Sequence, residues 1–140
     1  EYYDKHKFII TIKGEVCGPC CSFKRNMYKL KDNVLYLFDA YNSSTSSYFD
    51  LNLLKDLANE FEIPMVPIVE EKTKLNFNSV DEIMKYAKGK SELYPFVDRE
   101  GIVIRSIDPR VEGVQFMANN RFSFKVLNDD FLLKIEKTNK

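Results

Sequence analysis

The spacing of apolar residues divides the first half of the chain into predicted strands and loops. Residues 7–13 (KFIITIK) and 34–40 (VLYLFDA) combine β-branched and aromatic residues and predict two strands. Residues 14–22 are punctuated by Gly and Pro and predict a loop, and the serine-rich residues 43–47 predict another loop at the surface. Residues 63–69 contain two prolines, which limits this segment to a short or edge strand.

Two segments have apolar residues at helical spacing. In residues 50–61 the apolar positions follow the helical repeat, and Asp50 is placed to cap the amino terminus. In residues 79–88, Ser79 is followed three residues later by Glu82, which is the pattern of a capping box. Each segment therefore predicts an amphipathic helix that buries one face.

The last third of the chain predicts three strands and a helix. The strands are expected over residues 101–107, 113–117 and 121–127, and the helix over residues 129–136. Strands and helices follow one another without a regular strand–helix–strand alternation. This order predicts an α+β fold of mostly antiparallel sheets with flanking helices, in a single domain over residues 1–140.

The run EGIVIR at residues 100–105 carries opposite charges at its two ends. Strict strand alternation divides the run into two faces, with Glu100, Ile102 and Ile104 on one and Gly101, Val103 and Arg105 on the other. A later strand brings in Lys125. A carboxylate and two cations delivered by strands suit a site for a phosphate and a metal, and a half-exposed strand with solvated ends is the alternative.

Composition limits the partners and the compartment. The 140 residues include 21 basic and 21 acidic side chains, so no overall field draws the chain to a nucleic acid or a membrane. The sequence has no secretory signal and no apolar run of membrane-spanning length, which predicts an intracellular, cytoplasmic protein without a membrane partner. Three cysteines make a poor disulfide framework and fit a reducing compartment. The chain begins at Glu1 without Met, which predicts that an amino-terminal part lies elsewhere.

Residues 17–20 (CGPC) match the redox motif of thioredoxins, in which a cysteine pair at a helix start exchanges disulfides. Three features weigh against this interpretation. Val16 stands where an aromatic residue normally precedes the motif, Cys21 adds a third thiol, and residues 91–140 would be left unexplained. A thioredoxin-like disulfide oxidoreductase is therefore the less favoured alternative.

Several stretches resemble, in order, the motifs of ATP-dependent RNA ligases, members of the covalent nucleotidyltransferase superfamily. These stretches are residues 12–15 (IKGE) and 26–30 (NMYKL) for the third motif and its continuation, 37–41 (LFDAY) for the next motif, 66–69 (VPIV) and the helix around 81–83 for the connecting segment, 100–105 (EGIVIR) for the fourth motif and 123–127 (SFKVL) for the fifth. Their order and spacing cover nearly the whole chain. The resemblance implies the fold of a ligase adenylation domain, of which this chain is an incomplete part.

The resemblance also implies an activity and its cofactors. These enzymes transfer AMP from ATP to a lysine and then to an RNA 5′-phosphate, and finally join this end to a 3′-hydroxyl. By this resemblance, Glu100 would bind Mg²⁺, Lys125 would contact the α-phosphate and Arg105 would make a further phosphate contact. Without the resemblance, each of them is an ordinary charged residue on a strand.

Three residues of the earlier motifs would hold the nucleotide. By the resemblance, Glu15 would hydrogen-bond the ribose or help orient the metal, Phe38 would stack on adenine, and Asp39 would support that loop. The plain alternatives are a polar loop residue, a core aromatic residue and a cap at a strand end.

The sequence departs from the family at two places. Leu127 occupies the position where many RNA ligases carry a second lysine in the fifth motif. The first motif, of the type Lys-x-Asp/Asn-Gly, does not occur, so no lysine of this chain can be nominated to accept AMP. Two hypotheses follow: an enzyme whose nucleophile lies in additional sequence, or a non-catalytic nucleotide- or RNA-binding module of the same fold. The sequence does not distinguish nicked duplex from single-stranded RNA, and it does not indicate an oligomeric state.

Overall fold

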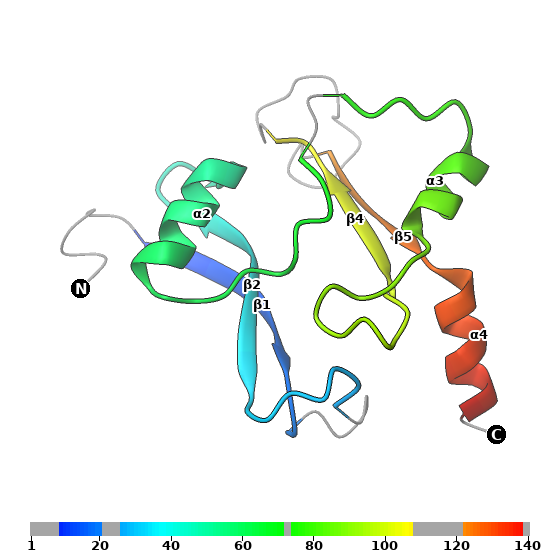
Figure 1. Ribbon diagram of the computed structural model, residues 1–140. Helices are drawn as coiled ribbons and strands as arrows, with labels where there is room; N and C mark the ends of the chain where they lie inside the picture. The colour runs from blue at the N-terminus through cyan, green and yellow to red at the C-terminus, as the bar shows by residue number, and fades with distance from the viewer. Residues whose placement is uncertain (1–8, 21–25, 72–73, 108–121, 139–140) are drawn as a thin grey trace. The chain divides into compact units, whose positions relative to one another are not determined.

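The computed structural model describes residues 9–20, 26–71, 74–107 and 122–138 (Figure 1). The chain divides into two compact units. Unit 1 comprises Glu1–Val66 and Ser106–Phe122, and unit 2 comprises Pro67–Arg105 and Ser123–Lys140. The strand predicted at residues 113–117 lies outside the described residues. That the chain forms a single domain stays a prediction.

Unit 1 contains a three-stranded antiparallel sheet with the order β1-β2-β3. Its strands are β1 (Ile10–Cys17), β2 (Val34–Asn42) and β3 (Ser47–Tyr48). The loop prediction for residues 14–22 was therefore wrong at its start, because β1 continues to Cys17. The reason is that β1 keeps pairing with β2 beyond Gly14, and such pairing with a distant segment outweighs local propensity.

A register shift between Lys13 and Gly14 lets two residues of β2 face the core. Lys13 pairs with Asp39, but Gly14 pairs with Leu37, so β2 carries one extra residue, Phe38, at this point. Residues that pair across a sheet share a face. Because Ile12 and Gly14 lie on the same face of β1, their partners Ala40 and Leu37 also lie on one face. Both are almost completely buried.

Helix α2 (Leu51–Glu60) adds Leu54, Leu57 and Ala58 to this core and confirms the predicted helix. Asp50 is the N-cap, because its Oδ1 atom accepts a hydrogen bond of 2.9 Å from the backbone N–H of Leu53. The core consists of Leu37, Ala40, Phe49, Leu54, Leu57 and Ala58. The strand predicted at residues 63–69 is reduced to one parallel bridge between Met65 and Leu37.

Unit 2 contains a two-stranded antiparallel ribbon and two helices. The ribbon is formed by β4 (Gly101–Arg105) and β5 (Ser123–Leu127), and the helices are α3 (Val80–Ala87) and α4 (Asp129–Thr138). Ser79 caps α3 as predicted, since its hydroxyl accepts a 3.2 Å hydrogen bond from the N–H of Glu82. The core contains Ala87, Ile102 and Ile104, with Phe77, Ile83, Tyr86, Phe124 and Val126 packed against them.

The predicted α+β class with antiparallel sheets is confirmed. Among the described residues, none of the helices has the length and apolar character needed to cross a membrane.

Candidate nucleotide-binding site

The β4–β5 ribbon has one face toward the core of unit 2 and one face carrying charged residues. The core face holds Ile102 and Ile104, with Phe124 and Val126 of β5. Val103 lies on the other face, where it is 50% exposed and stands opposite Lys125. The alternation predicted for Ile102, Val103 and Ile104 is thus confirmed, and it leaves Lys125 accessible.

Glu100 and Lys125 form an ion pair at the start of β4. The distance between Glu100 Oε1 and Lys125 Nζ is 2.5 Å, and the two side chains are 32% and 49% exposed. Glu100 precedes β4, and its carboxylate contacts Lys125, whose position on β5 lies on the opposite face from Ile102. Gly101, between Glu100 and Ile102, has a φ of 155°, so the backbone departs from a regular strand at this residue.

Gly101 cannot be replaced without moving the ribbon. A Cβ atom at this position would lie 2.1 Å from the carbonyl oxygen of Val126, far inside van der Waals contact. The obstructing atom belongs to the backbone of β5, so no side-chain rotation relieves the overlap. The glycine of the EGIVIR run is therefore required at this position, because it allows the close approach of the β4 and β5 backbones next to the Glu100–Lys125 pair.

Arg105 closes β4 on the same face as Lys125. It pairs with Ser123, two residues from Lys125 along β5, so the two cations are diagonal neighbours. Side chains in this relation start roughly 7–8 Å apart, within reach of one phosphate group for long basic residues. The structure therefore places all three predicted residues of the fourth and fifth motifs, Glu100, Arg105 and Lys125, on the β4–β5 ribbon of unit 2.

The three residues predicted to hold the nucleotide belong to the β1–β2 pair of unit 1. Asp39 is buried, and its Oδ1 accepts a 3.0 Å hydrogen bond from the N–H of Ala40. Glu15 is exposed and pairs with Tyr36. Because Lys13 and Glu15 lie on one face of β1, and Lys13 pairs with Asp39, the two acids share that face. Phe38 is half-buried and lies at the register shift.

Lys13 joins this face and was not predicted as a site residue. Its Nζ donates a 2.9 Å hydrogen bond to the hydroxyl of Tyr48 and lies 4.7 Å from the centroid of that ring. Tyr48 in turn packs edge-on against Tyr41 at 5.2 Å. Lys13 belongs to the IKGE stretch, for which only Glu15 was predicted as a site residue. Its position opposite Asp39 depends on the strand register, which the sequence does not reveal.

A metal at the β4–β5 ribbon would rest on a single protein carboxylate. The described residues contain no group of three or more His, Cys, Asp or Glu side chains that could hold a metal ion. Mg²⁺ often binds through one or two carboxylates, and water and substrate phosphates complete its coordination. The accessible carboxylate of Glu100, on the charged face of the ribbon, fits that mode of binding.

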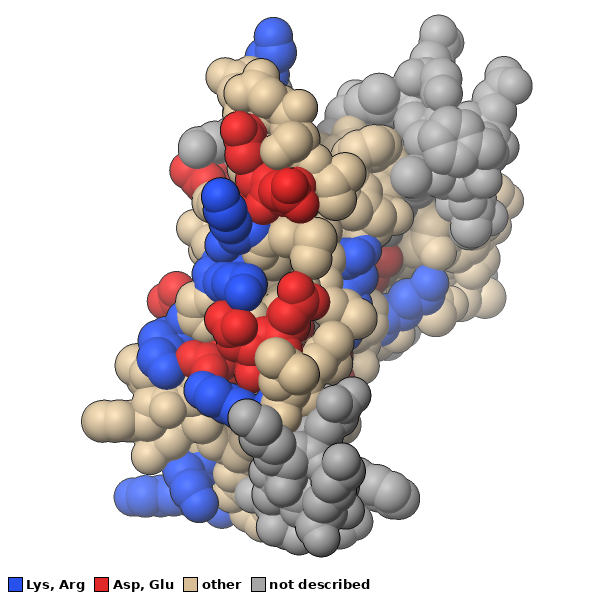
Figure 2. Space-filling view, turned by 90° about the vertical axis from the view of Figure 1, so that its right-hand side faces the viewer, with Lys and Arg blue, Asp and Glu red and all other residues tan. Residues whose placement is uncertain are grey.

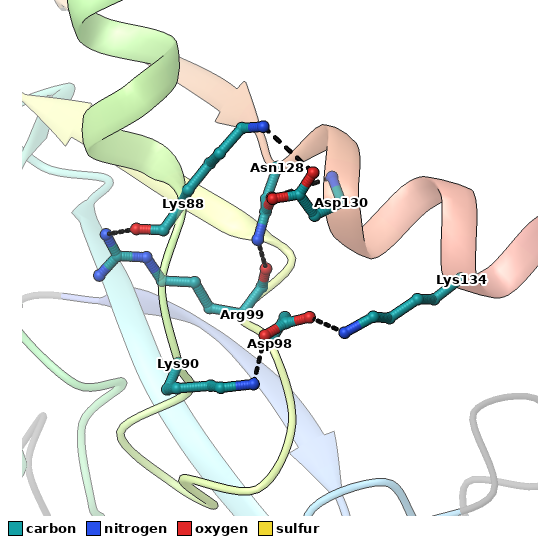
Figure 3. A network of polar contacts seen from close by, with 7 residues as sticks. All are labelled: Lys88, Lys90, Asp98, Arg99, Asn128, Asp130 and Lys134. Atoms are coloured by element: carbon teal, nitrogen blue, oxygen red, sulfur yellow. Dashed lines mark hydrogen bonds and ion pairs between the residues drawn. The ribbon is translucent and has the colours of Figure 1, made fainter.

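A polar network in unit 2 includes Asp98 and Arg99, the two residues that precede Glu100 in the chain (Figure 3). Asp98 accepts hydrogen bonds from Lys90, at 2.6 Å, and from Lys134 of α4. The hydrogen bond from Lys134, followed by that from Lys90, holds the pKa of Asp98 below its usual range. Lys88 and Asp130 form a further ion pair at 3.1 Å. Figure 2 shows the same mixture on a larger scale, with basic and acidic side chains interspersed on the face it presents.

The helix that the thioredoxin motif needs after the CGPC stretch would fall on residues 21–25, which lie outside the described residues. Cys17 is buried at the end of β1, and Cys20 is exposed. The backbone N–H of Cys20 donates a 2.8 Å hydrogen bond to Asn33 Oδ1.

Comparison with known proteins yields one family and one group of solved structures. The family model described as RNA ligase matches residues 3–127. A Naegleria gruberi RNA ligase solved with PPi is 26% identical, with a TM-score of 0.74, and the match covers 96% of this chain and 36% of that one. A mutant of that ligase with ATP and Mn (26% identity, TM-score 0.73) and one with AMP and Mn (28%, 0.74) each match 94% of this chain and 36% of theirs. The chain thus spans about a third of the length of these ligases. No curated protein matches it in sequence.

Proposed function

This chain belongs to the RNA ligase family, and we propose that the protein containing it is an ATP-dependent RNA ligase that joins RNA ends through adenylylated intermediates. The observation that carries the proposal is the Glu100–Lys125 pair on the charged face of the β4–β5 ribbon. In this proposal the carboxylate and the lysine, 2.5 Å apart, both act at the phosphates of the nucleotide.

The ribbon would act on the phosphates of the nucleotide. Transfer of a phosphoryl-linked group depends mainly on positioning and on neutralising charge at phosphorus. Lys125 would hold the α-phosphate, and Arg105, its diagonal neighbour, would hold a second phosphate oxygen. Glu100 would hold Mg²⁺, which would supply positive charge at the phosphates. The Mn present with ATP or AMP in the Naegleria structures supports a divalent ion and a nucleotide for this family.

The β1–β2 pair would hold the nucleoside. In this proposal Phe38 stacks on adenine, Glu15 hydrogen-bonds the ribose, and Asp39 supports the strand around Phe38. The buried Asp39 supports this role, since its hydrogen bond to the N–H of Ala40 stiffens β2 next to the register shift. Lys13, on the same face as Glu15, adds a positive charge there.

The AMP-accepting lysine would lie outside residues 1–140. No Lys-x-Asp/Asn-Gly sequence occurs in the chain, and Lys125, which belongs to the fifth motif, has a different role in the proposal. The chain is then the part of an adenylation domain that carries the third to fifth motifs. The RNA 5′-phosphate and 3′-hydroxyl are the proposed substrates.

The test is the intact mass of the full natural protein after incubation with ATP and Mg²⁺. We expect a covalent AMP adduct, and we expect Glu100→Ala and Lys125→Ala to slow its formation by on the order of 100-fold each. Lys85→Ala, which removes an exposed lysine of α3 in the same unit, is the matched control and should form the adduct at the normal rate.

An unmodified mass would contradict the proposal. It would favour the second candidate, a non-catalytic nucleotide- or RNA-binding module. Leu127 stands in place of the second lysine and the first motif does not occur in residues 1–140, and both observations are consistent with such a module. Binding of ATP without an adduct, weakened by Lys125→Ala, would then identify the module.

A further inference from the structure

Asn128, between β5 and α4, is a buried polar residue with unusually complete hydrogen bonding. Its side chain is 1% exposed. Its backbone N–H donates to the carbonyl of Glu100 at 2.8 Å, and its side-chain Nδ2 donates to the carbonyl of Arg99 at 2.8 Å. Its Oδ1 accepts from the N–H of Asp130 at 3.1 Å. Asn128 thus holds the two carbonyl groups on either side of the Glu100 α-carbon. Figure 3 shows the bond to Arg99.

Arg99 fixes the same stretch from the other side. Its guanidinium donates to the last carbonyl groups of α3 and to the residue after the helix: 2.5 Å to Tyr86, 2.9 Å to Ala87 and 2.8 Å to Lys88. Its backbone N–H donates to the carbonyl of Gly89 at 2.9 Å. The residue before Glu100 is therefore attached to α3 by its side chain and to the start of α4 by its carbonyl.

We propose that Asn128 is a positioning residue that holds Glu100 in place to pair with Lys125. Lys125 lies on β5 three residues before Asn128, so one short segment supplies both the lysine and the clamp on the backbone of Glu100. The catalytic consequence of this role rests on the proposed ligase function, but the positioning itself does not.

Capping of α4 alone does not account for Asn128. A cap needs only a side-chain oxygen, which Ser, Thr or Asp supplies as well as Asn. In this chain the oxygen caps α4, and the amide nitrogen makes a separate bond to the carbonyl of Arg99. That second bond points toward Glu100, and it distinguishes a positioning residue from a simple cap.

The test separates these two bonds in the full natural protein. Asn128→Asp has the same shape and keeps the capping oxygen, but it removes the donor to Arg99. Asn128→Ser also keeps a capping oxygen and lacks the donor, without adding a charge. Ser79→Ala, which removes the cap of α3 in the same unit, is the matched control for lost stability. The ¹³Cδ chemical shift of Glu100 is measured in each protein with and without Lys125→Met. The readout is the change in this chemical shift that Lys125→Met causes.

In the wild type and in Ser79→Ala we expect Lys125→Met to shift the Glu100 signal, because the pair is broken. In the Asn128 variants we expect Lys125→Met to leave the Glu100 signal unchanged, since Glu100 no longer contacts Lys125. If Lys125→Met still changes the Glu100 chemical shift by the wild-type amount in folded Asn128→Ser or Asn128→Asp, the proposal is overturned, whether or not the protein is a ligase.

Adenylylation is measured separately and tests the proposed function. If the protein is a ligase, we expect the Asn128 variants to lose on the order of 10- to 100-fold in rate, the range expected for a misplaced contact. Suppose that the response of the Glu100 signal to Lys125→Met is lost in the Asn128 variants, and that the full natural protein forms no adduct. This result would support the positioning role and contradict the ligase function.

Discussion

Single residues decide whether the Glu100–Lys125 pair can form, and Gly101 shows this most directly. Its φ of 155° and the 2.1 Å approach to the carbonyl of Val126 leave no room for a side chain. We predict that Gly101→Ala lowers the free energy of unfolding by about 2–4 kcal/mol, because the ribbon must open to admit the Cβ atom. Chemical denaturation measures this loss.

The control for Gly101→Ala lies two residues further along β4. Val103 is 50% exposed, so Val103→Ala should change the free energy of unfolding by about 0.5 kcal/mol or less. Equal stability of Gly101→Ala and the wild type would show that the ribbon tolerates the extra atom and that the close approach is not required.

Asp98 gives unit 2 a predicted dependence of stability on acid pH. Its pKa is lowered by hydrogen bonds from Lys134 and Lys90, so its contribution is complete above the unfolded value of about 3.9. It is lost as the pH falls through the lower, folded value. Because both lysines are largely exposed, we expect Asp98→Asn to cost about 1 kcal/mol or less at pH 7. The difference should vanish at strongly acid pH.

Urea unfolding of the wild type and Asp98→Asn at neutral and acid pH measures this effect. Replacing Lys134 and Lys90 by Met in one protein should reproduce it, because the cause of the lowered pKa is then removed. A constant difference between Asp98→Asn and the wild type at every pH would contradict the prediction.

At the scale of single residues, the sequence predicted that certain charged residues lie close together better than it predicted where their side chains point. Glu100, Arg105 and Lys125 were predicted from a family pattern, and the structure brings them to one ribbon. The contact of Glu100 with the opposite face depends on Gly101, and the role of Asn128 depends on backbone groups. The glycine is visible in the sequence but the contact it permits is not, and a buried asparagine looks like a turn residue in a sequence.

Among the elements, α3 depends on Arg99, a residue from a segment that follows it in the chain. The guanidinium satisfies three carbonyl groups at the end of the helix, and this geometry needs the planar fork of arginine. We predict that Arg99→Lys lowers the free energy of unfolding by about 2 kcal/mol, since an ammonium group cannot reach all three acceptors. Thermal unfolding measures it.

Lys85→Ala serves as a control for Arg99→Lys, because Lys85 is an exposed basic residue of α3 itself. It should leave the melting temperature nearly unchanged. A wild-type melting temperature for Arg99→Lys would show that the carbonyl groups are satisfied equally well by water.

The elements predicted correctly are those with local signals. Asp50 and Ser79 cap α2 and α3 as expected, because a cap and its partner lie within one turn. The end of β1 and the extra residue Phe38 in β2 were missed, since register is set by pairing between distant segments. The same shift places Leu37 and Ala40 on one face and so determines the core.

Over the whole molecule, the candidate site residues belong to two compact units. Glu15, Phe38 and Asp39 lie in unit 1, and Glu100, Arg105 and Lys125 lie in unit 2. The proposed nucleoside contacts belong to unit 1, and the proposed phosphate and metal contacts belong to unit 2. With 21 basic and 21 acidic residues, neither task relies on a net charge of the chain.

The location of the AMP-accepting lysine is a prediction about the protein as a whole. After the full natural protein has reacted with ATP and Mg²⁺, peptide mapping should place the adduct on a lysine outside residues 1–140, within a Lys-x-Asp/Asn-Gly sequence. Residues 1–140 alone should stay unmodified, because every lysine among them lacks that context. Circular dichroism must first show that this shorter protein is folded. An adduct mapped to Lys13, Lys125 or another lysine of this chain would show that the nucleophile is present here, and the roles proposed for Glu100 and Lys125 would have to be reassigned.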